Sequence, residues 1–226
     1  MQETGITIEF EVSGPLALFT DPMTKTGGEK MSYPIPTYGG LMGIAKNIYF
    51  KPTFMWVLEK VRICNKIQMF SQGQRLPHCS EAGTDLADFT YLRNVRYQVR
   101  AHLVWNENYP EMEKDRIVEK HADIMRRALV RGGRRPITLG PSECVGEVRP
   151  CQFGEGAGCY DGMDMDFGLM LHSVTWPDEG WDEVSKRSRM SHFWMPRMRD
   201  GVIEFVTPEQ CPVHKNLTEI REAVAV

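Results

Sequence analysis

The stretch EKHADIMRRALVRGGRRPITLG covers residues 119–140 and contains a Lys-His pair, Lys120 and His121. A histidine titrates near physiological pH, so His121 could both accept and donate a proton in a reaction. A neighbouring lysine could stabilise the negative charge of a crowded phosphorane. In the structural alternative, His121 is a residue at the edge of the core and Lys120 is a solvated charge. Spacing alone favours this alternative.

Three arginines flank a Gly-Gly step in the same stretch: Arg131 precedes it, and Arg134 and Arg135 follow it. Glycines let the backbone approach a phosphate closely, and the guanidinium group binds phosphate through paired hydrogen bonds. Alternatively, Gly132 and Gly133 end a helix, and the cations stabilise the C-terminal end of its dipole. This alternative explains Arg131 better than the two arginines beyond the helix end. Both interpretations remain open at this level.

The basic residues are concentrated in one part of an otherwise acidic chain. The 226 residues carry a formal net charge of -3, which gives no global argument for binding nucleic acid. Residues 114–135 contain eight Lys or Arg against three Asp or Glu, whereas the rest contains 19 against 27. Arg116 and Arg127 share a face with Lys120 on the helix expected here. This distribution predicts a local anion site.

Two other groups of residues have a functional and a structural interpretation. Tyr49 follows an expected helix, where a phenol could stack on a base or bind a phosphate, or could simply anchor the helix end. Arg96, Arg100 and His102 share the polar face of an expected strand, which could line an RNA groove or face solvent. The structural interpretation is favoured for both groups.

Metal and cofactor chemistry has little support in the sequence. Asp161, Asp164 and Asp166 lie in YDGMDMDFG, but their spacing does not match a calcium loop, so a turn is favoured. A metal-dependent nuclease that uses these three carboxylates is a weaker hypothesis. The cysteines and histidines form no zinc pattern, and the chain has no P-loop, nucleophile elbow or dinucleotide fingerprint. We expect no cofactor and no metal.

Apolar periodicity predicts the elements that position these residues. Strict alternation indicates strands at residues 6–12 and 95–105. The spacing of Leu41, Ile44 and Ile48 predicts a helix that begins after Thr37 and ends before Pro52. The remaining expected elements are a loop at 14–36, a strand at 54–70, a loop containing Pro77 and Gly83, a helix at 111–131 that Gly132 and Gly133 end, and a weaker strand at 143–151.

The expected order is β-α-β-β-α-β, which is the α+β ferredoxin-like arrangement shared by many RNA-binding domains. The aromatic signature of a standard RNA recognition motif is missing. Short strands follow from Phe153 onward. We therefore expect a ferredoxin-like domain at residues 1–152 and a small antiparallel β extension with a tail at residues 153–226.

The N-terminus has no basic start followed by an apolar run, and no apolar stretch is long enough to span a bilayer. The chain has six cysteines and none forms a C-x-x-C pair, so reduced thiols are expected. These features favour a cytoplasmic protein that has no membrane partner.

Several long motifs, in order, resemble the CRISPR-associated Cas5 family in its subtype I-C branch. They are GPLALFTDPMTKTGGEKMSYPIPTYGGLMGI, IYFKPTFMWV, RGGRRPITLGPSECVGEVRPC and YDGMDMDFGLMLH. The resemblance runs from Ile6 to about Trp176, although GMDMDFGLMLHSVTW and the C-terminal tail depart from the family pattern. It implies membership of the repeat-associated (RAMP) superfamily, with a ferredoxin-like fold.

The resemblance also implies an activity and a site. In other branches the corresponding subunit caps the 5′ end of the CRISPR RNA and a separate nuclease cuts the precursor, whereas in the I-C branch this subunit is understood to cut. The family's catalytic tyrosine, lysine and histidine would fall on Tyr49, Lys120 and His121.

The hypothesis from sequence is a metal-independent endoribonuclease that cleaves the repeat stem-loop of precursor CRISPR RNA. The 2′-hydroxyl would attack the scissile phosphate and leave a 2′,3′-cyclic phosphate. The subunit would then cap the 5′ end of the CRISPR RNA in the type I-C complex. Its expected partners are the repeat hairpin, the other subunits of the complex and, as a further candidate, duplex DNA. The alternative is a subunit that binds RNA without cutting it. The residues expected to hold the RNA backbone are Arg131, Arg134, Arg135, Arg116, Arg127, Lys25 and Lys30.

Overall fold

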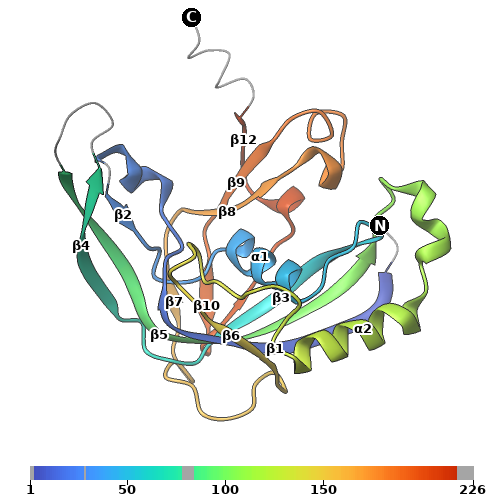
Figure 1. Cartoon of the computed structure of the whole chain (residues 1–226), viewed down its shortest axis with the longest axis horizontal. Helices are drawn as coiled ribbons and strands as arrows, with labels where there is room; N and C mark the ends of the chain where they lie inside the picture. Colours follow the sequence, from blue (N-terminus) through green and yellow to red (C-terminus); the bar gives the residue numbers. More distant parts are fainter. Residues whose placement is uncertain (1–2, 28, 78–83, 218–226) are drawn as a thin grey trace, which may run out of the picture.

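The computed structural model describes residues 3–27, 29–77 and 84–217 as a strand-rich mixed α/β protein with antiparallel sheets (Figure 1). Within these residues, nine strands form one large sheet in the order β6-β1-β5-β3-β11-β10-β7, with β2 and β4 also paired to β5. These strands are β1 (Glu3–Ala17), β2 (Lys30–Met31), β3 (Phe54–Ile63), β4 (Met69–Pro77), β5 (Thr84–Trp105), β6 (Glu147–Pro150), β7 (Met165–Asp166), β10 (Arg197–Arg199) and β11 (Val202–Glu204).

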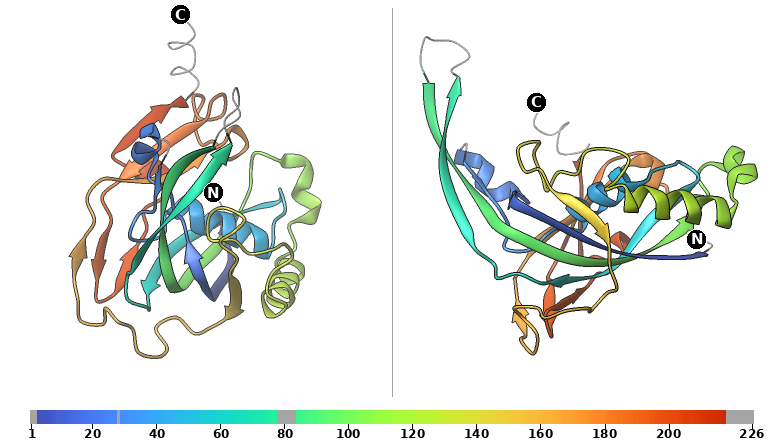
Figure 2. Two further views of the ribbon diagram at one scale, coloured as in Figure 1. Left: turned by 60° about the vertical axis from the view of Figure 1, so that its left-hand side comes forward. Right: turned by 60° about the horizontal axis from the view of Figure 1, so that its bottom comes forward.

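The helices are few and short. Helix α1 (Tyr38–Ile48) and helix α2 (Val118–Val130) lie on the same side of the large sheet (Figures 1 and 2). Short 3-10 helices are η1 (Pro22–Gly27), η2 (Pro110–Asp115), η3 (Pro177–Glu179) and η4 (Pro208–Gln210).

The C-terminal part of the chain contributes to both sheets. The small sheet, in the order β12-β9-β8, consists of β8 (Met170–Thr175), β9 (Met190–Trp194) and β12 (Val213–Asn216). Strands β7, β10 and β11 instead extend the large sheet, because β11 pairs antiparallel with β3. The short strands expected after Phe153 are therefore divided between the two sheets.

Strands β1 and β5 form the centre of the large sheet, with Phe10 opposite Val99 in an antiparallel pair. The alternating apolar residues of both strands are buried, as the sequence pattern predicts. The strand expected at 95–105 is longer than predicted, because β5 begins at Thr84 and pairs along its first half with β4. This hairpin extends away from the rest of the protein (Figure 2). The predicted loop with Pro77 was wrong at that residue, whereas Gly83 lies outside the described residues.

The strand expected at 54–70 is two strands. Strand β3 ends at Ile63, and β4 begins at Met69. Opposite the break, Asn94 of β5 has a φ of 50°, and its carbonyl accepts a hydrogen bond from Asn65 Nδ2 at 2.9 Å. The left-handed residue lies between Leu92, where the pairing with β4 ends, and Tyr97, where the pairing with β3 begins, so β5 pairs with two separate strands. Similarly, the loop expected at 14–36 contains the end of β1, η1 and β2.

The helix expected at 111–131 was wrong in its first turns. Turn η2 ends at Asp115, and α2 begins only at Val118. The intervening Arg116 is held by its guanidinium, which donates to the Asn106 carbonyl at 3.0 Å. Arg116 therefore does not share a helical face with Lys120 and Arg127.

Helix α1 begins and ends as the sequence predicts. The Thr37 hydroxyl accepts a hydrogen bond from the Gly40 N–H at 3.0 Å, and Leu41, Ile44 and Ile48 are buried. At the other end, the Tyr49 N–H donates to the Ala45 carbonyl at 3.2 Å. The cap at Thr37 and the core contacts together fix the position and direction of α1, and therefore the position of Tyr49 at its end.

No helix in the described part of the chain is long and apolar enough to cross a membrane. The described cysteines, Cys64, Cys144, Cys151, Cys159 and Cys211, are free thiols. Cys79 lies outside the described residues.

We predict that Thr37→Ala lowers the free energy of unfolding by about 1 kcal/mol, because the Gly40 N–H loses its capping acceptor. Urea denaturation followed by circular dichroism measures this change. Thr37→Ser is the control, since it keeps the hydroxyl. Equal destabilisation by both variants would contradict a capping role.

Candidate active site

Tyr49 and His121 meet in the interior of the protein. The Tyr49 hydroxyl lies 3.0 Å from His121 Nδ1, although 72 positions separate the two residues. Tyr49 follows the last turn of α1, and His121 lies in the first turn of α2. Both side chains have 0% exposure, and the rings of Phe54 and Trp105 pack against the imidazole.

The second nitrogen of His121 identifies the tautomer. His121 Nε2 lies 2.7 Å from the main-chain carbonyl oxygen of Asp115. A carbonyl can only accept, so Nε2 carries the proton. Nδ1 of the neutral ring is then the acceptor, and the Tyr49 hydroxyl donates to it.

The carboxylate of Asp115 joins Lys120 to this group. Lys120 Nζ donates to Asp115 Oδ1, and Thr53 Oγ1 donates to Oδ2 at 2.9 Å. The hydrogen bond from Lys120 is the main cause that lowers the pKa of Asp115, followed by the hydrogen bond from Thr53. Lys120 remains partly exposed, at 41% of its side chain, so its ammonium lies between solvent and the buried pair.

Tyr49 remains a neutral donor at physiological pH. Burial raises the pKa of its phenol, and the nearby Asp115 charge acts in the same direction. The guanidinium of Arg134, 5.4 Å from the centroid of the tyrosine ring, opposes this shift.

The Gly-Gly turn returns the chain to the end of α1. Gly132 and Gly133 have φ values of 83° and 101°, and the Gly133 N–H donates to the Ala128 carbonyl at 2.9 Å. This is the predicted helix C-cap. Beyond it, the N–H groups of Arg134 and Arg135 each donate to the Asn47 carbonyl at 3.1 Å. These two bonds place the arginines beside Tyr49.

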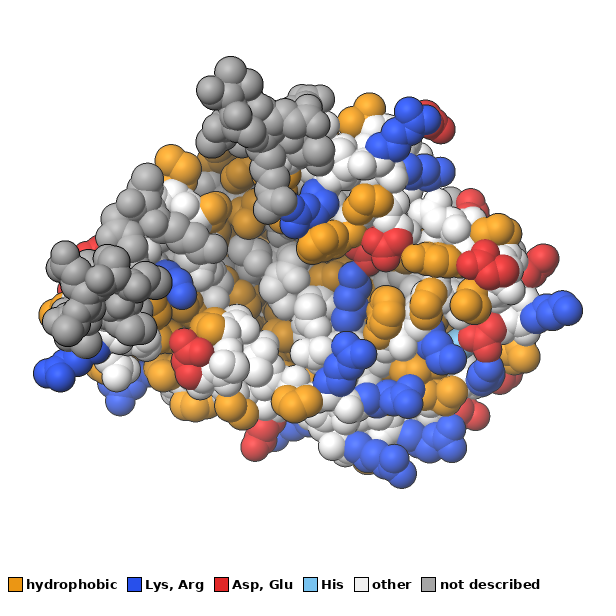
Figure 3. Space-filling view, turned by 45° about the horizontal axis from the view of Figure 1, so that its top comes forward, with side chains coloured by type: hydrophobic (Ala, Val, Ile, Leu, Met, Phe, Trp, Pro, Cys, Tyr) orange, Lys and Arg blue, Asp and Glu red, His pale blue; other side chains and the backbone are white. Residues whose placement is uncertain are grey.

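A basic surface surrounds the buried pair. The side chains of Arg127, Arg131, Arg134 and Arg135 are exposed. Figure 3 shows Lys and Arg side chains gathered over the side of the molecule on which α2 lies in Figure 1. Arg116 is instead half-buried and bonded to the main chain.

The two lysines predicted to hold RNA from the N-terminal loop lie elsewhere. Lys25 is in η1 and Lys30 is in β2, on the opposite side of the molecule from α2 (Figure 1). Lys30 Nζ lies 4.6 Å from the centroid of the Phe89 ring. The structure therefore does not bring these lysines together with the arginines near Tyr49.

The polar face of β5 forms cross-strand ion pairs. Arg96 lies 3.6 Å from Glu11, Arg100 lies 3.4 Å from Glu59, and His102 Nδ1 lies 2.8 Å from Glu59. Each of these three side chains thus has an acidic neighbour from an adjacent strand, which agrees with the structural interpretation of this face.

The three carboxylates of YDGMDMDFG also have cationic partners. Both oxygens of Asp161 accept from Arg62 Nη2, at 2.7 and 2.8 Å. Asp164 and Asp166 lie 3.6 and 3.7 Å from Arg199. Within the described residues, no group of three or more His, Cys, Asp or Glu is arranged to hold a metal ion.

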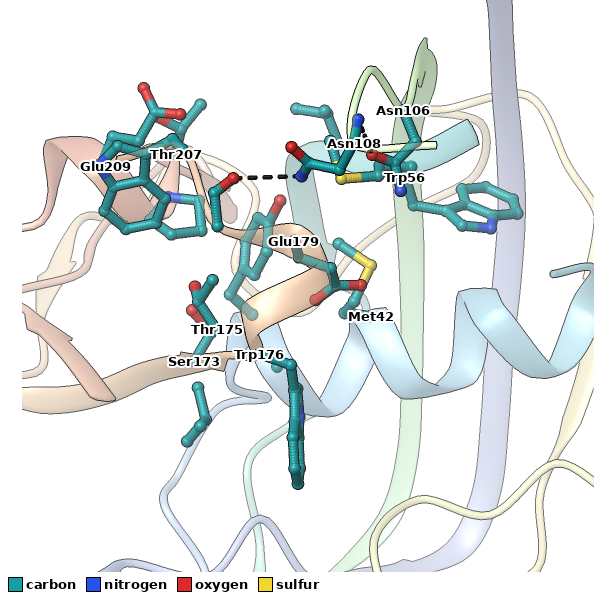
Figure 4. A pocket seen from close by; sticks show the side chains of 18 of the residues that line it. Met42, Trp56, Asn106, Asn108, Ser173, Thr175, Trp176, Glu179, Thr207 and Glu209 are labelled. Carbon is teal, nitrogen blue, oxygen red and sulfur yellow. Dashed lines mark hydrogen bonds between the residues drawn. The ribbon is translucent and has the colours of Figure 1, made fainter. Parts of the chain in front are cut away.

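A separate cavity of about 750 Å³ lies between α1, β3 and the segment that follows β8 (Figure 4). Its lining includes neither Tyr49 nor His121. The charged residues in the lining are Lys46, Lys186, Glu107, Glu179 and Glu209, and Lys46 is paired with Glu179. Acidic residues outnumber basic ones, so the cavity is poorly suited to a phosphate backbone.

Two residues of the candidate site were not singled out from the sequence. Asp115 was included in a predicted helix, where its side chain would have pointed away from His121. Thr53 follows Pro52 and carried no chemical signal of its own. The Asp115 contact depends on the interruption of the helix between η2 and α2, which the apolar periodicity of the sequence did not reveal.

A family model described as CRISPR-associated protein (Cas_Cas5) matches residues 7–206. The chain is 25% identical over 224 residues to a Mannheimia succiniciproducens protein named CRISPR pre-crRNA endoribonuclease Cas5d, covering 87% of this chain and 93% of that protein. It is also similar to a crystal structure of a CRISPR-associated protein, with a TM-score of 0.76 and 31% identity, covering 93% of this chain and 96% of the other. A functionally uncharacterized protein from Streptococcus mutans gives a TM-score of 0.73 at 33% identity, covering 93% and 97% of the two chains.

We predict that Asp115→Asn lowers the free energy of unfolding by an amount that depends on pH. The pKa of Asp115 in the folded protein lies below its ordinary value of 3.8, so its carboxylate stabilises the fold above that value. As pH falls, the unfolded chain takes up the proton first, and the advantage of the native residue disappears. Urea denaturation from about pH 7 to about pH 3 measures this convergence. Asp123→Asn, an exposed carboxylate on α2, is the matched control, and a difference for Asp115→Asn that stays constant with pH would contradict the prediction.

Proposed function

The chain belongs to the Cas5 family of CRISPR-associated proteins, and from this premise we propose that it is an endoribonuclease that cleaves precursor CRISPR RNA. The observation that carries the proposal is the hydrogen-bonded set of Tyr49, His121, Asp115 and Lys120 beside an arginine-rich surface. The name of the Mannheimia relative, a pre-crRNA endoribonuclease, supports the same activity.

A ferredoxin-like core is the fold that we infer for this activity. The strands β6-β1-β5-β3 are neighbours in that order, and each adjacent pair is antiparallel. Helix α1 connects β1 to β3, and α2 connects β5 to β6. This connectivity supports the β-α-β-β-α-β arrangement.

In the proposed reaction, the nucleophile comes from the RNA. The 2′-hydroxyl next to the scissile phosphate transfers its proton to His121 Nδ1, and its oxygen bonds to phosphorus. The bond from phosphorus to the 5′-oxygen breaks, that oxygen takes a proton from solvent to become a 5′-hydroxyl, and His121 returns its proton to solvent. The other product ends in a 2′,3′-cyclic phosphate. These steps assign the chemistry to side chains, in keeping with the paired state of Asp161, Asp164 and Asp166.

Lys120 and Tyr49 complete the proposed site. The Lys120 ammonium stabilises the charge that develops on the phosphate oxygens. In the free protein the Tyr49 hydroxyl donates to His121 Nδ1. When RNA is bound, this hydroxyl positions the phosphate or the 2′-hydroxyl. Both rings are fully buried, so RNA binding must open the contact between them before the 2′-hydroxyl can reach Nδ1.

The RNA backbone is proposed to lie across the exposed arginines. Arg134 lies over the Tyr49 ring, Arg135 is bonded through its N–H to Asn47 at the end of α1, and Arg127 and Arg131 continue the surface along α2. The repeat stem-loop of subtype I-C is the proposed substrate. After cleavage, the protein would remain at the 5′ end of the CRISPR RNA with the other subunits of the complex.

One observation favours a second candidate function, in which the protein binds CRISPR RNA without cutting it. Tyr49 and His121 have 0% exposure, which suits a structural pair as well as a closed active site. A binding subunit would use the same arginines and leave the interior undisturbed.

We predict that His121→Gln lowers the rate of repeat cleavage in EDTA at least 100-fold, within the range by which general acid-base groups accelerate reactions, about 10²- to 10⁴-fold. Binding of the repeat changes less than about twofold, because the exposed arginines, and not the buried His121, make the proposed phosphate contacts. Single-turnover cleavage and a filter-binding assay measure the two effects. A repeat with one 2′-deoxy substitution at the cut site should bind and resist cleavage.

Tight binding of the native repeat with no product from the wild-type protein would support the second candidate function. Cleavage that EDTA abolishes would contradict the proposed chemistry.

We predict that Arg135→Gln weakens repeat binding and reduces its dependence on salt. Loss of one phosphate contact lowers the slope of log affinity against log salt by about 0.7 to 0.9. Arg187→Gln is the matched control, because Arg187 is an exposed arginine that pairs with Glu183 in the C-terminal part of the chain. Equal slopes for Arg135→Gln and the wild-type protein would remove Arg135 from the proposed RNA surface.

A further inference from the structure

Asp115 contacts the proposed site through two different groups. Its main-chain carbonyl accepts from His121 Nε2 at 2.7 Å, and its carboxylate accepts from Lys120 Nζ and from Thr53 Oγ1. One residue thus contacts both the buried imidazole and the partly exposed ammonium.

We propose that Asp115 is the positioning residue of this site, which selects the His121 tautomer and stabilises the protonated imidazole formed during cleavage. The inference rests on the proposed function, because it concerns the same reaction. Asp115 would act through His121 and Lys120 rather than on the RNA itself.

The carbonyl contact decides which nitrogen is available. A proton on Nε2 leaves Nδ1 unprotonated, and only an unprotonated nitrogen can accept the proton of a 2′-hydroxyl. With the other tautomer, two acceptors would face each other at 2.7 Å between Nε2 and the carbonyl. The geometry therefore favours the tautomer that the proposed reaction needs.

The carboxylate contact concerns the charge of the ring. Asp115 Oδ2 lies 3.6 Å from His121 Nε2, so it can stabilise an imidazolium once Nδ1 has taken a proton. On its other side the ring faces the Tyr49 hydroxyl. The nearby cations are directed at other groups: Lys120 pairs with Asp115 Oδ1, and the Arg134 guanidinium lies 5.4 Å from the centroid of the Tyr49 ring. Among these described groups, the Asp115 carboxylate provides the negative charge.

Thr53 holds the carboxylate in this place. Its side chain has 0% exposure, and its own carbonyl accepts from the Asn106 N–H at 3.0 Å. The hydroxyl therefore comes from a buried, hydrogen-bonded residue directly before β3. A donor fixed in this way limits the rotation of the Asp115 side chain.

Asp115→Asn tests the charge while it keeps the size of the side chain and the main-chain carbonyl. We expect the single-turnover cleavage rate to fall about 10- to 100-fold. We also expect the Nε2 resonance of His121 to shift, because the carboxylate 3.6 Å from this nitrogen loses its charge. Nitrogen-15 NMR of the free protein measures that resonance and the tautomer, with the His121 signal assigned from His121→Gln.

The NMR measurement needs no RNA and thus separates the two proposals. If the wild-type protein does not cleave the repeat, the proposed function fails, and the positioning inference is then decided by the Nε2 resonance and the tautomer alone. An unchanged Nε2 resonance in Asp115→Asn, or a proton on Nδ1 of the native ring, would overturn the inference. Asp123→Asn on α2 should match the wild-type protein in both measurements.

Thr53 provides a second test that leaves Asp115 in place. Thr53→Val removes the hydroxyl at nearly constant volume, and we expect the cleavage rate to fall about 3- to 10-fold, the effect of one lost hydrogen bond. Thr53→Ser keeps the hydroxyl and should restore most of the rate. If Thr53→Val and Thr53→Ser lower the cleavage rate equally, the Thr53 hydroxyl has no role in holding Asp115.

Discussion

The buried imidazole of His121 needs a hydrogen-bond partner for each ring nitrogen, and the local structure depends on this requirement. An unpaired nitrogen in the interior would cost about 1–3 kcal/mol. Tyr49 supplies one partner from the end of α1, and the Asp115 carbonyl supplies the other from the end of η2. The Tyr49 contact constrains how α1 packs against α2. The Asp115 contact depends on the non-helical residues between η2 and α2.

The same arrangement relates the buried pair to the surface. Asp115 contacts both the enclosed ring and the partly exposed Lys120, while the Gly-Gly turn brings Arg134 and Arg135 back to the end of α1. A neutral, closed interior thus lies directly beneath cations that could hold an anion. For an enzyme whose substrate is a polyanion, this layering would keep the reactive nitrogen away from water until the substrate displaces the tyrosine.

Much of the local structure followed from sequence pattern. Alternation located β1 and the second half of β5, and Thr37 and the Gly-Gly step marked helix ends where the structure has them. Patterns failed where strand pairing without a buried apolar face decided the outcome. The β4–β5 hairpin exposes Met69, Phe70 and Leu86, and the break between β3 and β4 lies opposite Asn94, whose backbone is left-handed.

For the site, the sequence by itself supplied the residue types and the family resemblance that linked Tyr49 to Lys120 and His121. It also determined the concentration of basic residues at 114–135, the segment that includes α2. Only the tertiary structure could bring Tyr49 within 3.0 Å of His121, reveal Asp115 and Thr53 as their neighbours, and separate Lys25 and Lys30 from the arginines. The physical reason is that these contacts join residues from different elements. Their distances depend on how α1, η2 and α2 pack on one sheet, which no local periodicity encodes.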